Sequence, residues 1–299
     1  MRKYIAVIGL GSIGKRYVKK LNFLNYKVLG LDKKKFENEK NNFYFNNKNF
    51  FLKECKKLKC KFVIISTLSD SHYYYLKLVL NNGFKKILLE KPISNNYFNA
   101  LKILKLSKNN NVFLGTHYKW NILKLSSYLR RIENKYKTGK VLFFNILGGA
   151  NCISTGGMHW IDFVLDHLNM KKKNFEINAN INAKKINPRS KKFNYIDGLL
   201  NLSFKKNTFL NLIFSNKSRL VTNVQIVYKH HFINLKANGK IEISRTSKNL
   251  DNKPITRYDM PKLINSTKFK NLDSETAVLK NLIFNKNPLL TIDNSLISY

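Results

Sequence analysis

A glycine-rich turn close to the start of the chain constrains the fold more than any other feature. Residues 3–8, KYIAVI, form an apolar, β-rich run, and GLGSIG at 9–14 follows it at once. Apolar residues then recur at helical spacing, at Ile13, Tyr17, Val18, Leu21 and Leu24. The glycines are therefore expected at a strand-to-helix turn, the context in which a G-x-G-x-x-G pattern indicates dinucleotide binding.

Each glycine has its own task in such a turn. Gly9 makes the tight turn, Gly11 lets the backbone approach a pyrophosphate, and Gly14 lets the helix pack closely on the strand. The N–H groups at the start of the helix, at Ser12 and Ile13, then face the negative charge. A glycine turn in an unrelated α/β protein is the alternative interpretation.

The next apolar segment bears on the choice of dinucleotide. YKVLGLD at 26–32 is predicted to be a second strand ending at Asp32. A carboxylate there can accept hydrogen bonds from the adenosine ribose hydroxyls, which favours NAD. Residues 33–35 are three lysines, and a cation beside the ribose can hold the 2′-phosphate of NADP, so NADP stays possible.

Two further strand-like segments end in polar residues. FVIIST at 62–67 leads into LSDSH at 68–72, and KILL at 86–89 leads into EKP at 90–92. The carboxyl ends of parallel strands share the edge where ligands bind, so Thr67 and His72 are predicted to contact the cofactor. For His72, a helix-capping or core role is an equal alternative.

Glu90 and Lys91 are the polar residues at the last of these strand ends. Both are predicted to lie beside the cofactor. A lysine partly withdrawn from water has its pKa lowered towards the range in which it exchanges protons, so Lys91 is the first candidate for acid/base chemistry. The plain alternative is a solvated surface lysine.

The bulk composition bounds the class of protein. The chain has 299 residues, 43% of them hydrophobic, which suits two domains with modest cores. Its apolar runs are of strand length, so no membrane partner is expected. Three cysteines without a metal-like pairing fit a reducing cytoplasm and predict neither a disulfide scaffold nor a metal site.

The formal net charge of +38 invites a nucleic-acid interpretation. Lys far outnumbers Arg, however, and Lys, Asn, Ile, Phe and Tyr are enriched evenly along the chain, as compositional bias produces. We therefore expect no specific nucleic-acid partner. A nucleic-acid-binding protein remains an alternative hypothesis. It predicts tight nucleic-acid binding that survives ~200 mM salt. A basic cleft would also attract phosphorylated or nucleotide-linked substrates.

Five motifs stand in a fixed order, and together they resemble a known family. The order is the glycine turn at 9–14, STLSDSH at 66–72, EKP at 90–92, GTHYKWN at 115–121 and GGMHWID at 156–162. This set is similar to the glucose-fructose oxidoreductase, inositol dehydrogenase and rhizopine-catabolism (Gfo/Idh/MocA) family of NAD(P)-dependent sugar oxidoreductases. The resemblance implies a cis Lys-Pro peptide in the EKP motif.

The resemblance also implies a two-domain α/β architecture. An N-terminal Rossmann domain with a doubly wound parallel sheet is expected over residues 1–118. A C-terminal α+β domain, built on an open, mainly antiparallel sheet, is expected over 119–299 for substrate binding and oligomerisation. In the family such sheets often pair face to face between subunits, so a homo-oligomer, dimer or tetramer, is expected.

The rest of the sequence is compatible with this division. β-branched and aromatic runs separated by Asn/Gly turns predict antiparallel strands within 139–149, 175–185, 199–216 and 223–244. ANGK at 237–240 is predicted to be a hairpin turn. The Asn/Lys-rich segment 38–49 is expected to be a plain connection, and 289–299 a short final helix.

The substrate site follows from the resemblance residue by residue. Lys91 is expected to touch both the nicotinamide and the substrate hydroxyl, and His159 to take or give the proton. Lys119 and Trp120 stand where the family usually has Arg-Phe, and Thr155 stands where it usually has Asp. Asp162 lies three residues after His159. The residues predicted to bind the substrate are Lys119, Trp120, Thr155, His159 and Asp162. For His159 the alternative is a satisfied histidine on a helix flank.

The expected reaction is hydride transfer between a nicotinamide and a hydroxyl or keto carbon of a sugar or nucleotide sugar, with surface-polysaccharide synthesis as one setting. Thr155 cannot hold a charge as Asp would, which weakens His159 as a base and moves the principal role to Lys91. The alternative function is a cofactor-binding sensor or scaffold that has lost catalysis. Such a protein would bind NAD yet reduce no sugar.

Overall fold

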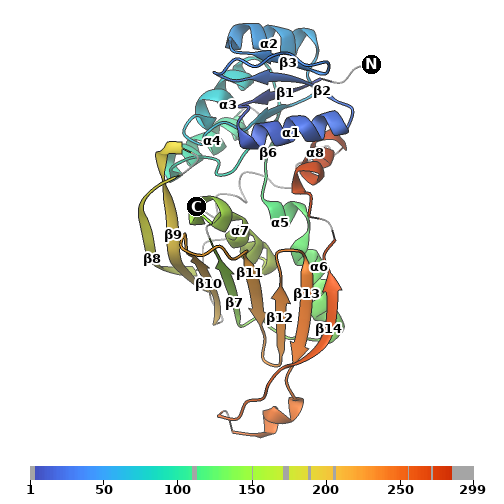
Figure 1. Cartoon of the computed structure of the whole chain (residues 1–299), viewed down its shortest axis with the longest axis vertical. Coiled ribbons are helices and arrows are strands. Elements are labelled where there is room, and N and C mark those ends of the chain that lie inside the picture. The colour runs from blue at the N-terminus through green and yellow to red at the C-terminus, as the bar shows by residue number, and fades with distance from the viewer. Residues whose placement is uncertain are drawn as a thin grey trace. The chain divides into compact units, whose positions relative to one another are not determined.

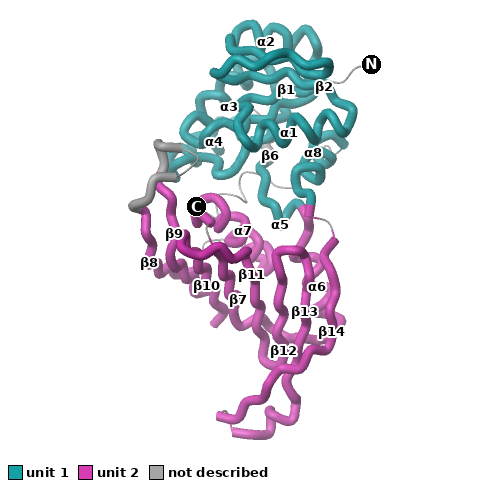
Figure 2. The backbone as a smooth tube through the Cα atoms, in the orientation of Figure 1, with its two compact units in different colours: residues 1–122, 273–299 teal, residues 123–272 magenta. Residues whose placement is uncertain are grey.

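The computed structural model describes residues 4–109, 113–149, 151–170, 175–187, 190–204, 207–254, 256–270 and 272–284. The chain divides into two compact units, coloured separately in Figure 2. The first consists of Met1–Ile122 together with Asp273–Tyr299, and the second is Leu123–Leu272.

This division differs from the boundary predicted at 118/119, because the chain returns to the first unit at its end. Helix α8 (Ser274–Phe284) buries Val278, Leu279 and Leu282 and contacts α1 (Ser12–Phe23) and α5 (Lys119–Ile122) of that unit. The sequence prediction assigned this segment to the second domain. A short amphipathic helix shows which face is apolar but not which partner covers it.

The first unit contains a doubly wound parallel sheet with helices on both faces. Within the described residues the strand order is β3-β2-β1-β4-β5-β6, and every neighbouring pair is parallel. Figure 1 labels β1, β2, β3 and β6 of this sheet. The strands are β1 (Tyr4–Ile8), β2 (Lys27–Leu31), β3 (Asn42–Phe45), β4 (Val63–Ile65), β5 (Lys86–Leu89) and β6 (Phe113–Thr116). The helices between them are α1, α2 (Lys48–Lys57), α3 (His72–Asn81) and α4 (Tyr97–Asn109). This is the dinucleotide-binding fold that the glycine turn predicted.

Buried hydrophobic strands hold this sheet together. Ile5 to Ile8 of β1 and Val63 to Ile65 of β4 are at most 1% exposed, as expected for parallel strands covered on both faces. One segment was wrong in the sequence prediction: 38–49 is not a plain connection, because it contains β3 and the start of α2. The strand has only four residues and lies at the sheet edge. Among so many Asn and Lys residues it forms no apolar run that predicts a strand.

The second unit is built on one large sheet. Within the described residues its strand order is β14-β13-β12-β11-β7-β10-β9-β8, and all neighbours are antiparallel except β7 with β10. The strands are β7 (Phe143–Gly148), β8 (Phe175–Asn187), β9 (Ser190–Phe204), β10 (Thr208–Phe214), β11 (Asn223–Val227), β12 (His231–Leu235), β13 (Lys240–Arg245) and β14 (Lys262–Lys268). The mainly antiparallel sheet was expected, and so was the hairpin at 237–240, which joins β12 to β13. β14 was not predicted.

Helices α6 (Leu125–Tyr136) and α7 (Met158–His167) of this unit pack against each other, and α7 covers one face of the sheet. The rings of Phe163 and His167 of α7 contact Phe144 of β7 at centroid distances of 6.1 and 5.7 Å. Strand β10 alternates buried Leu210 and Leu212 with exposed Phe209 and Ile213. The opposite face of the sheet is therefore open.

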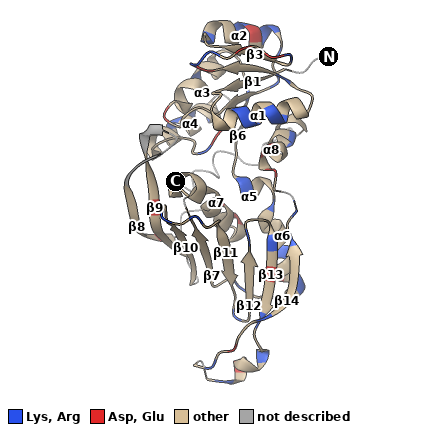
Figure 3. Cartoon of the chain, in the orientation of Figure 1, with Lys and Arg blue, Asp and Glu red and all other residues tan. Residues whose placement is uncertain are grey.

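Two remaining expectations concern the chain's surface and end. In the described part of the chain, no helix is both long and apolar enough to cross a bilayer. The helix expected at 289–299 lies outside the described residues. Lys and Arg occur on helices and loops of both units (Figure 3), as expected from their even spread along the sequence.

Candidate active site

The glycine turn lies between β1 and α1, and its geometry explains each glycine. Gly9 has a φ of +90°, a left-handed conformation that favours glycine. A Cβ on Gly14 would stand 1.9 Å from the carbonyl oxygen of Gly9, so only glycine lets α1 approach the turn this closely. A Cβ on Gly11 would meet no protein atom within 4 Å, and Gly11 and Ser12 are exposed. Gly11 therefore borders open space at the N-terminus of α1, as a pyrophosphate cradle requires.

Asp32 directly follows β2 and is tied to this turn. Its Oδ2 accepts the backbone N–H of Leu10 at 2.6 Å, and its Oδ1 accepts that of Lys34 at 3.0 Å. A pocket of about 290 Å³ opens beside it, and its lining includes Lys33, Lys48 and Tyr74. The structure thus places a carboxylate and two lysines together, the two chemistries that respectively suit a ribose diol and a 2′-phosphate.

The end of β4 closes the other side of the turn. The Oγ of Ser66 donates to the carbonyl oxygen of Gly9 at 2.8 Å, and a Cβ on Gly9 would stand 2.7 Å from the backbone N of Thr67. Thr67 is partly exposed next to the glycines, where the sequence predicted it.

His72 is 1% exposed and lies deeper than Thr67. Its Nε2 lies 3.1 Å from the carbonyl oxygen of Thr67, and its Nδ1 lies 3.1 Å from that of Ile93. Burial lowers the pKa of His72, although these carbonyl groups act in the opposite sense. His72 thus links the segments that follow β4 and β5, which matches the core role left open as the alternative to cofactor contact.

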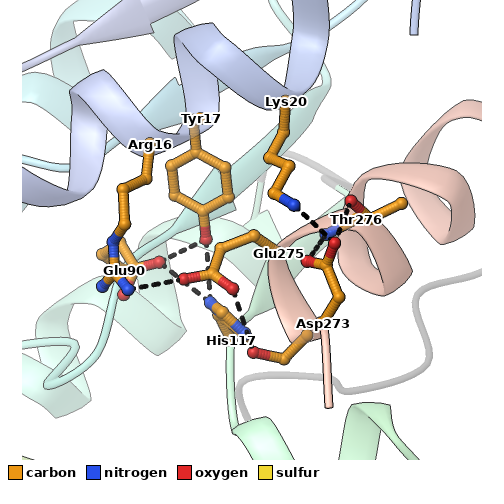
Figure 4. Close-up of polar contacts among 9 residues, drawn as sticks. Arg16, Tyr17, Lys20, Glu90, His117, Asp273, Glu275 and Thr276 are labelled. Carbon is orange, nitrogen blue, oxygen red and sulfur yellow. Dashed lines mark hydrogen bonds and ion pairs between the residues drawn. The ribbon is translucent and has the colours of Figure 1, made fainter. Parts of the chain in front are cut away.

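Glu90 and Lys91 follow β5, and their side chains have different surroundings. Glu90 is 5% exposed, and its Oε1 accepts the Tyr17 hydroxyl and lies 3.2 Å from His117 Nδ1 (Figure 4). Lys91 is half-buried, and the Lys91-Pro92 peptide is cis, as the resemblance implied. The carboxylate points into the protein, whereas the lysine stands at the strand-end edge that parallel sheets use for ligands.

Lys119 and Trp120 begin α5, shortly after β6. The Lys119 ammonium lies over the Trp120 ring, 4.3 Å from its centroid. Burial lowers the pKa of Lys119, Glu275 acts in the opposite sense, and Arg16 lowers it further. The pair keeps a cation stacked on an aromatic ring, an arrangement that can orient a polar ligand.

The GGMHWID motif lies in the second unit. Residues Ile153–Gly157 form one π-helical turn that leads into α7, and the carbonyl oxygen of Cys152 accepts N–H groups from Thr155, Gly156 and Gly157 at 3.2, 2.8 and 3.1 Å. A Cβ on Gly156 would stand 2.9 Å from Oδ1 of Asn151. The two glycines therefore serve a tight turn, and such π-turns frequently mark functional sites.

The predicted substrate residues of the second unit lie in this turn and in the helix that follows it. Thr155 lies within the turn, with its Oγ1 3.5 Å from the Cys152 carbonyl oxygen. His159 is half-buried in the first turn of α7, and Asp162, one turn later, is 5% exposed. The sequence predicted that Asp162 contacts substrate, and the structure places its side chain in a buried position.

The predicted site residues therefore fall into two groups, one in each unit. Gly9, Gly11, Gly14, Asp32 and Thr67 surround the start of α1 in the first unit. Thr155, His159 and Asp162 belong to the second unit. In the described residues no cluster of His, Cys, Asp and Glu is arranged to hold a metal ion.

Sequence reasoning missed the residues that surround Glu90. Tyr17 was assigned only to the apolar face of a helix, yet its hydroxyl donates to Glu90 and lies 2.9 Å from His117 Nδ1. Arg16 and Lys20 of α1 pair with Glu275 and Asp273 at the start of α8, at 2.9 and 2.5 Å. One sequence signal could have indicated this cluster. A tyrosine on the buried face of a helix carries a hydroxyl group that needs a hydrogen-bond partner inside the protein.

Comparisons with known proteins agree with this geometry. Residues 3–118 match the model of the Gfo/Idh/MocA oxidoreductase family, described as an NAD-binding Rossmann fold. No curated protein matches the chain in sequence.

Several solved structures share the fold. A 3-ketoreductase from Actinomadura kijaniata, in complex with TDP-benzene and NADP, is 11% identical, with a TM-score of 0.75 over 100% of this chain and 95% of that one. An oxidoreductase from Agrobacterium radiobacter, in complex with NAD+, L-tartaric acid and magnesium, is 12% identical, with a TM-score of 0.69 over 100% and 93%. UDP-N-acetylglucosamine 3-dehydrogenase from Acidithiobacillus ferrooxidans is 13% identical, with a TM-score of 0.65 over 100% and 94%.

At such identities these likenesses show a shared fold over nearly the full length of each chain. The family match adds the identity of the first domain, which a shared fold alone does not show. Residues 3–118 are therefore identified as an NAD-binding Rossmann domain of the Gfo/Idh/MocA oxidoreductase family.

Proposed function

We propose that the protein is an NAD(P)-dependent oxidoreductase acting on the hydroxyl or keto carbon of a sugar or nucleotide sugar. The observation that carries the proposal is the half-buried Lys91 just after β5, in the same parallel sheet as a glycine turn whose Gly11 borders open space. A sugar dehydrogenase needs both a dinucleotide and an acid/base group of this kind. The family match and two similar folds, a nucleotide-sugar 3-dehydrogenase and a 3-ketoreductase, support the substrate class.

The residues around the turn divide the work of holding the cofactor. The N–H groups of Ser12 and Ile13 at the start of α1 would hold the pyrophosphate, and Gly11 would leave room for it. Asp32 accepts from the adenosine ribose, and Thr67 lines the same edge. A bound nicotinamide would supply the hydride donor or acceptor for the reaction.

The proton is moved by side chains of this chain. Lys91 hydrogen-bonds the reacting oxygen and donates or accepts its proton, and His159 is the second group proposed to exchange a proton. Thr155, Asp162, Lys119 and Trp120 bind the sugar. Thr155 offers a hydroxyl rather than a carboxylate, so Lys91 is the principal acid/base group.

The decisive experiment titrates the protein with NAD(H) and NADP(H) in a thermal-shift assay, and then screens nucleotide sugars with the preferred dinucleotide. Lys91→Ala is expected to keep dinucleotide affinity within about twofold and to lose turnover by a factor of ~10² or more, the usual range for a removed acid/base group. Lys53→Ala, at an exposed lysine on α2, is the matched control. Failure of the wild type to bind either dinucleotide contradicts the proposal.

A sensor or scaffold that binds dinucleotide without turnover is the second candidate, and Thr155 favours it. Its hydroxyl lies within the π-turn near the Cys152 carbonyl oxygen and carries no charge. Such a protein binds NAD(P) with the same affinity but reduces no sugar in the screen. Thr155→Asp separates the two, because an added carboxylate raises the rate only where a reaction already occurs.

We also infer a homo-oligomer formed through the open face of the second sheet. The four adjacent strands β10, β7, β11 and β12 contain no Lys, Arg, Asp or Glu, in a chain of net charge +38. Depletion of charge is typical of the centre of an interface. A second copy is the occupant expected there, since an uncharged face lets two such basic chains meet without bringing like charges together.

Amide side chains line up across this face. Directly opposed positions on β9, β10, β7, β11 and β12 are Asn201, Asn211, Asn145, Gln225 and Asn234. Asn211 Nδ2 donates to Asn145 Oδ1 at 2.8 Å, whereas the Oδ1 atoms of Asn201 and Asn234 have no hydrogen-bond partner among the described residues. Exposed Phe209, Ile213 and Leu147 flank this row. We place the oligomer in the cytoplasm, where the three cysteines, free in the structure, stay reduced.

A further inference from the structure

A buried polar cluster lies beneath the turn that carries Lys91. Tyr17 comes from the middle of α1, Glu90 from the end of β5 and His117 from just after β6 (Figure 4). They are 0%, 5% and 6% exposed. Because all three elements belong to the first unit, the cluster joins the helix of the glycine turn to two neighbouring strand ends.

The hydrogen bonds of the cluster suit an ionised Glu90 carboxylate. The Tyr17 hydroxyl has one proton and donates it to Glu90 Oε1. His117 Nδ1 lies 2.9 Å from the same hydroxyl oxygen and 3.2 Å from Oε1, and in the tautomer with a hydrogen on Nδ1 it donates to these two oxygens. In that tautomer the arrangement satisfies an ionised carboxylate, which accepts only.

The second oxygen of the same carboxylate reaches the backbone of Lys91. Glu90 Oε2 accepts the Lys91 N–H at 3.2 Å, while the Glu90 N–H donates to the Ile65 carbonyl oxygen at 2.9 Å. The residue before Lys91 is thus fixed to β4 through its backbone and to α1 and β6 through its side chain. Both carboxylate oxygens are used inside the protein.

The charges around Glu90 come from several elements. Although burial raises it, the hydrogen bonds of His117 and Tyr17 and the charges of His117 and Lys91 hold the pKa of Glu90 below its ordinary value. Burial, followed by the Glu90 charge, raises the pKa of Tyr17 well above its usual range, so its proton stays in place. The other charged or titratable groups facing the cluster are Arg16 of α1, His72 of α3 and Glu275 of α8.

We propose that Glu90 is a positioning residue for Lys91 rather than a cofactor ligand, and that Tyr17 and His117 hold its carboxylate in place. Its negative charge favours the ammonium form of the neighbouring lysine, and its bond to the Lys91 N–H fixes the turn from which that side chain projects. The proposal rests on the proposed function only in that Lys91 is the acid/base group it serves. It departs from the sequence expectation that Glu90 contacts the dinucleotide.

The test measures the chemical reactivity of the Lys91 amine directly and needs no substrate. Wild type and Glu90→Gln are acetylated with trace acetic anhydride across a pH series, and the Lys91 peptide is quantified by mass spectrometry against the peptide of exposed Lys53. Loss of the anion is expected to raise the relative reactivity of Lys91 at neutral pH by ~3–10-fold, with its profile moved to lower pH. Dinucleotide affinity, measured by protein fluorescence, is expected to change by less than about threefold.

The matched control is Glu275→Gln, which removes a negative charge near Tyr17 but makes no bond to the Lys91 backbone. Its Lys91 profile is expected to match the wild type. Tyr17→Phe serves as the second variant should Glu90→Gln not fold, and it is expected to shift the Lys91 profile in the same direction by a smaller factor.

Two results overturn the proposal. One is an unchanged Lys91 profile in the folded variants. The other is a dinucleotide affinity lowered tenfold or more in Glu90→Gln with Lys91 unaffected, which makes Glu90 a cofactor ligand. Failure of the proposed function leaves this readout intact, because a wild type that binds no dinucleotide still reports the reactivity of Lys91.

Discussion

Gly11 and Gly14 make opposite demands, and alanine at each should separate dinucleotide binding from stability. An alanine Cβ at position 11 meets no protein atom within 4 Å and keeps a φ of −70°, which any residue adopts. An alanine Cβ at position 14 stands 1.9 Å from the Gly9 carbonyl oxygen and 3.0 Å from Ser66 Oγ. Ordinary contacts begin near 3.4 Å, so α1 must move by more than an ångström or the turn must open.

The two substitutions therefore have different expected magnitudes. Overpacking of this kind costs about 1–3 kcal/mol, so the Tm of Gly14→Ala should fall by roughly 3–10 °C. Gly11→Ala should change the Tm by less than about 2 °C, since nothing in the protein is displaced. It should weaken dinucleotide binding about 10- to 100-fold, or about 1.4–2.8 kcal/mol, because the methyl group takes the space of the pyrophosphate.

The assay is differential scanning fluorimetry without ligand, followed by titration of each variant with NAD(H) and NADP(H). Ser12→Ala, at the exposed neighbouring position, is the control for changes in the turn. The reasoning is refuted if Gly11→Ala binds dinucleotide as the wild type does, because the open side of the turn then has no ligand to exclude. A Gly14→Ala protein of unchanged Tm would refute the packing argument.

Three further predictions use other parts of the molecule. Asp32→Asn is expected to weaken NAD binding about tenfold and NADP binding less, because the ribose diol loses its anionic acceptor while Lys33 remains; equal losses in the two titrations would contradict this. Glu133 accepts from Tyr228 at 2.5 Å and His167 at 2.8 Å, and although burial raises it, these bonds and Arg130 lower the pKa of Glu133. Its contribution is present above the ordinary value of 4.5 and lost as pH falls through the lowered pKa, so Glu133→Gln should cost about 1–3 kcal/mol in urea unfolding at pH 7 and less at pH 3. A cost that does not depend on pH would exclude that role. Ile213→Lys on the open sheet face is expected to reduce the oligomer measured by light scattering, and the same change at exposed Phe23 of the first unit should leave it intact.

The sequence predicted the first unit well because its signals are local. A buried apolar strand, a turn that only glycine can make and a helix with one apolar face are each encoded within a few neighbouring residues. The order of such segments then determines a doubly wound sheet. β3 was missed because a four-residue edge strand rich in Asn has no such local signal.

The candidate site could be predicted only in part. The sequence predicted Asp32, Thr67 and Lys91 at strand ends, and they do lie just after β2, β4 and β5, where parallel strands bring their carboxyl ends together. The environment of Glu90 could not be predicted, since its partners lie 73 positions earlier and 27 positions later in the chain. A motif shows which residues are present but not which of them turn inwards.

The return of the chain to the first unit sets an order of assembly. The second unit, Leu123–Leu272, is one continuous segment, whereas the first is interrupted and receives α8 only after all of the second has been made. During synthesis, which proceeds from the N-terminus, the Rossmann sheet therefore has to persist with Arg16 and Lys20 still lacking their partners on α8. The last described helix to leave the ribosome is the one that completes the unit made first.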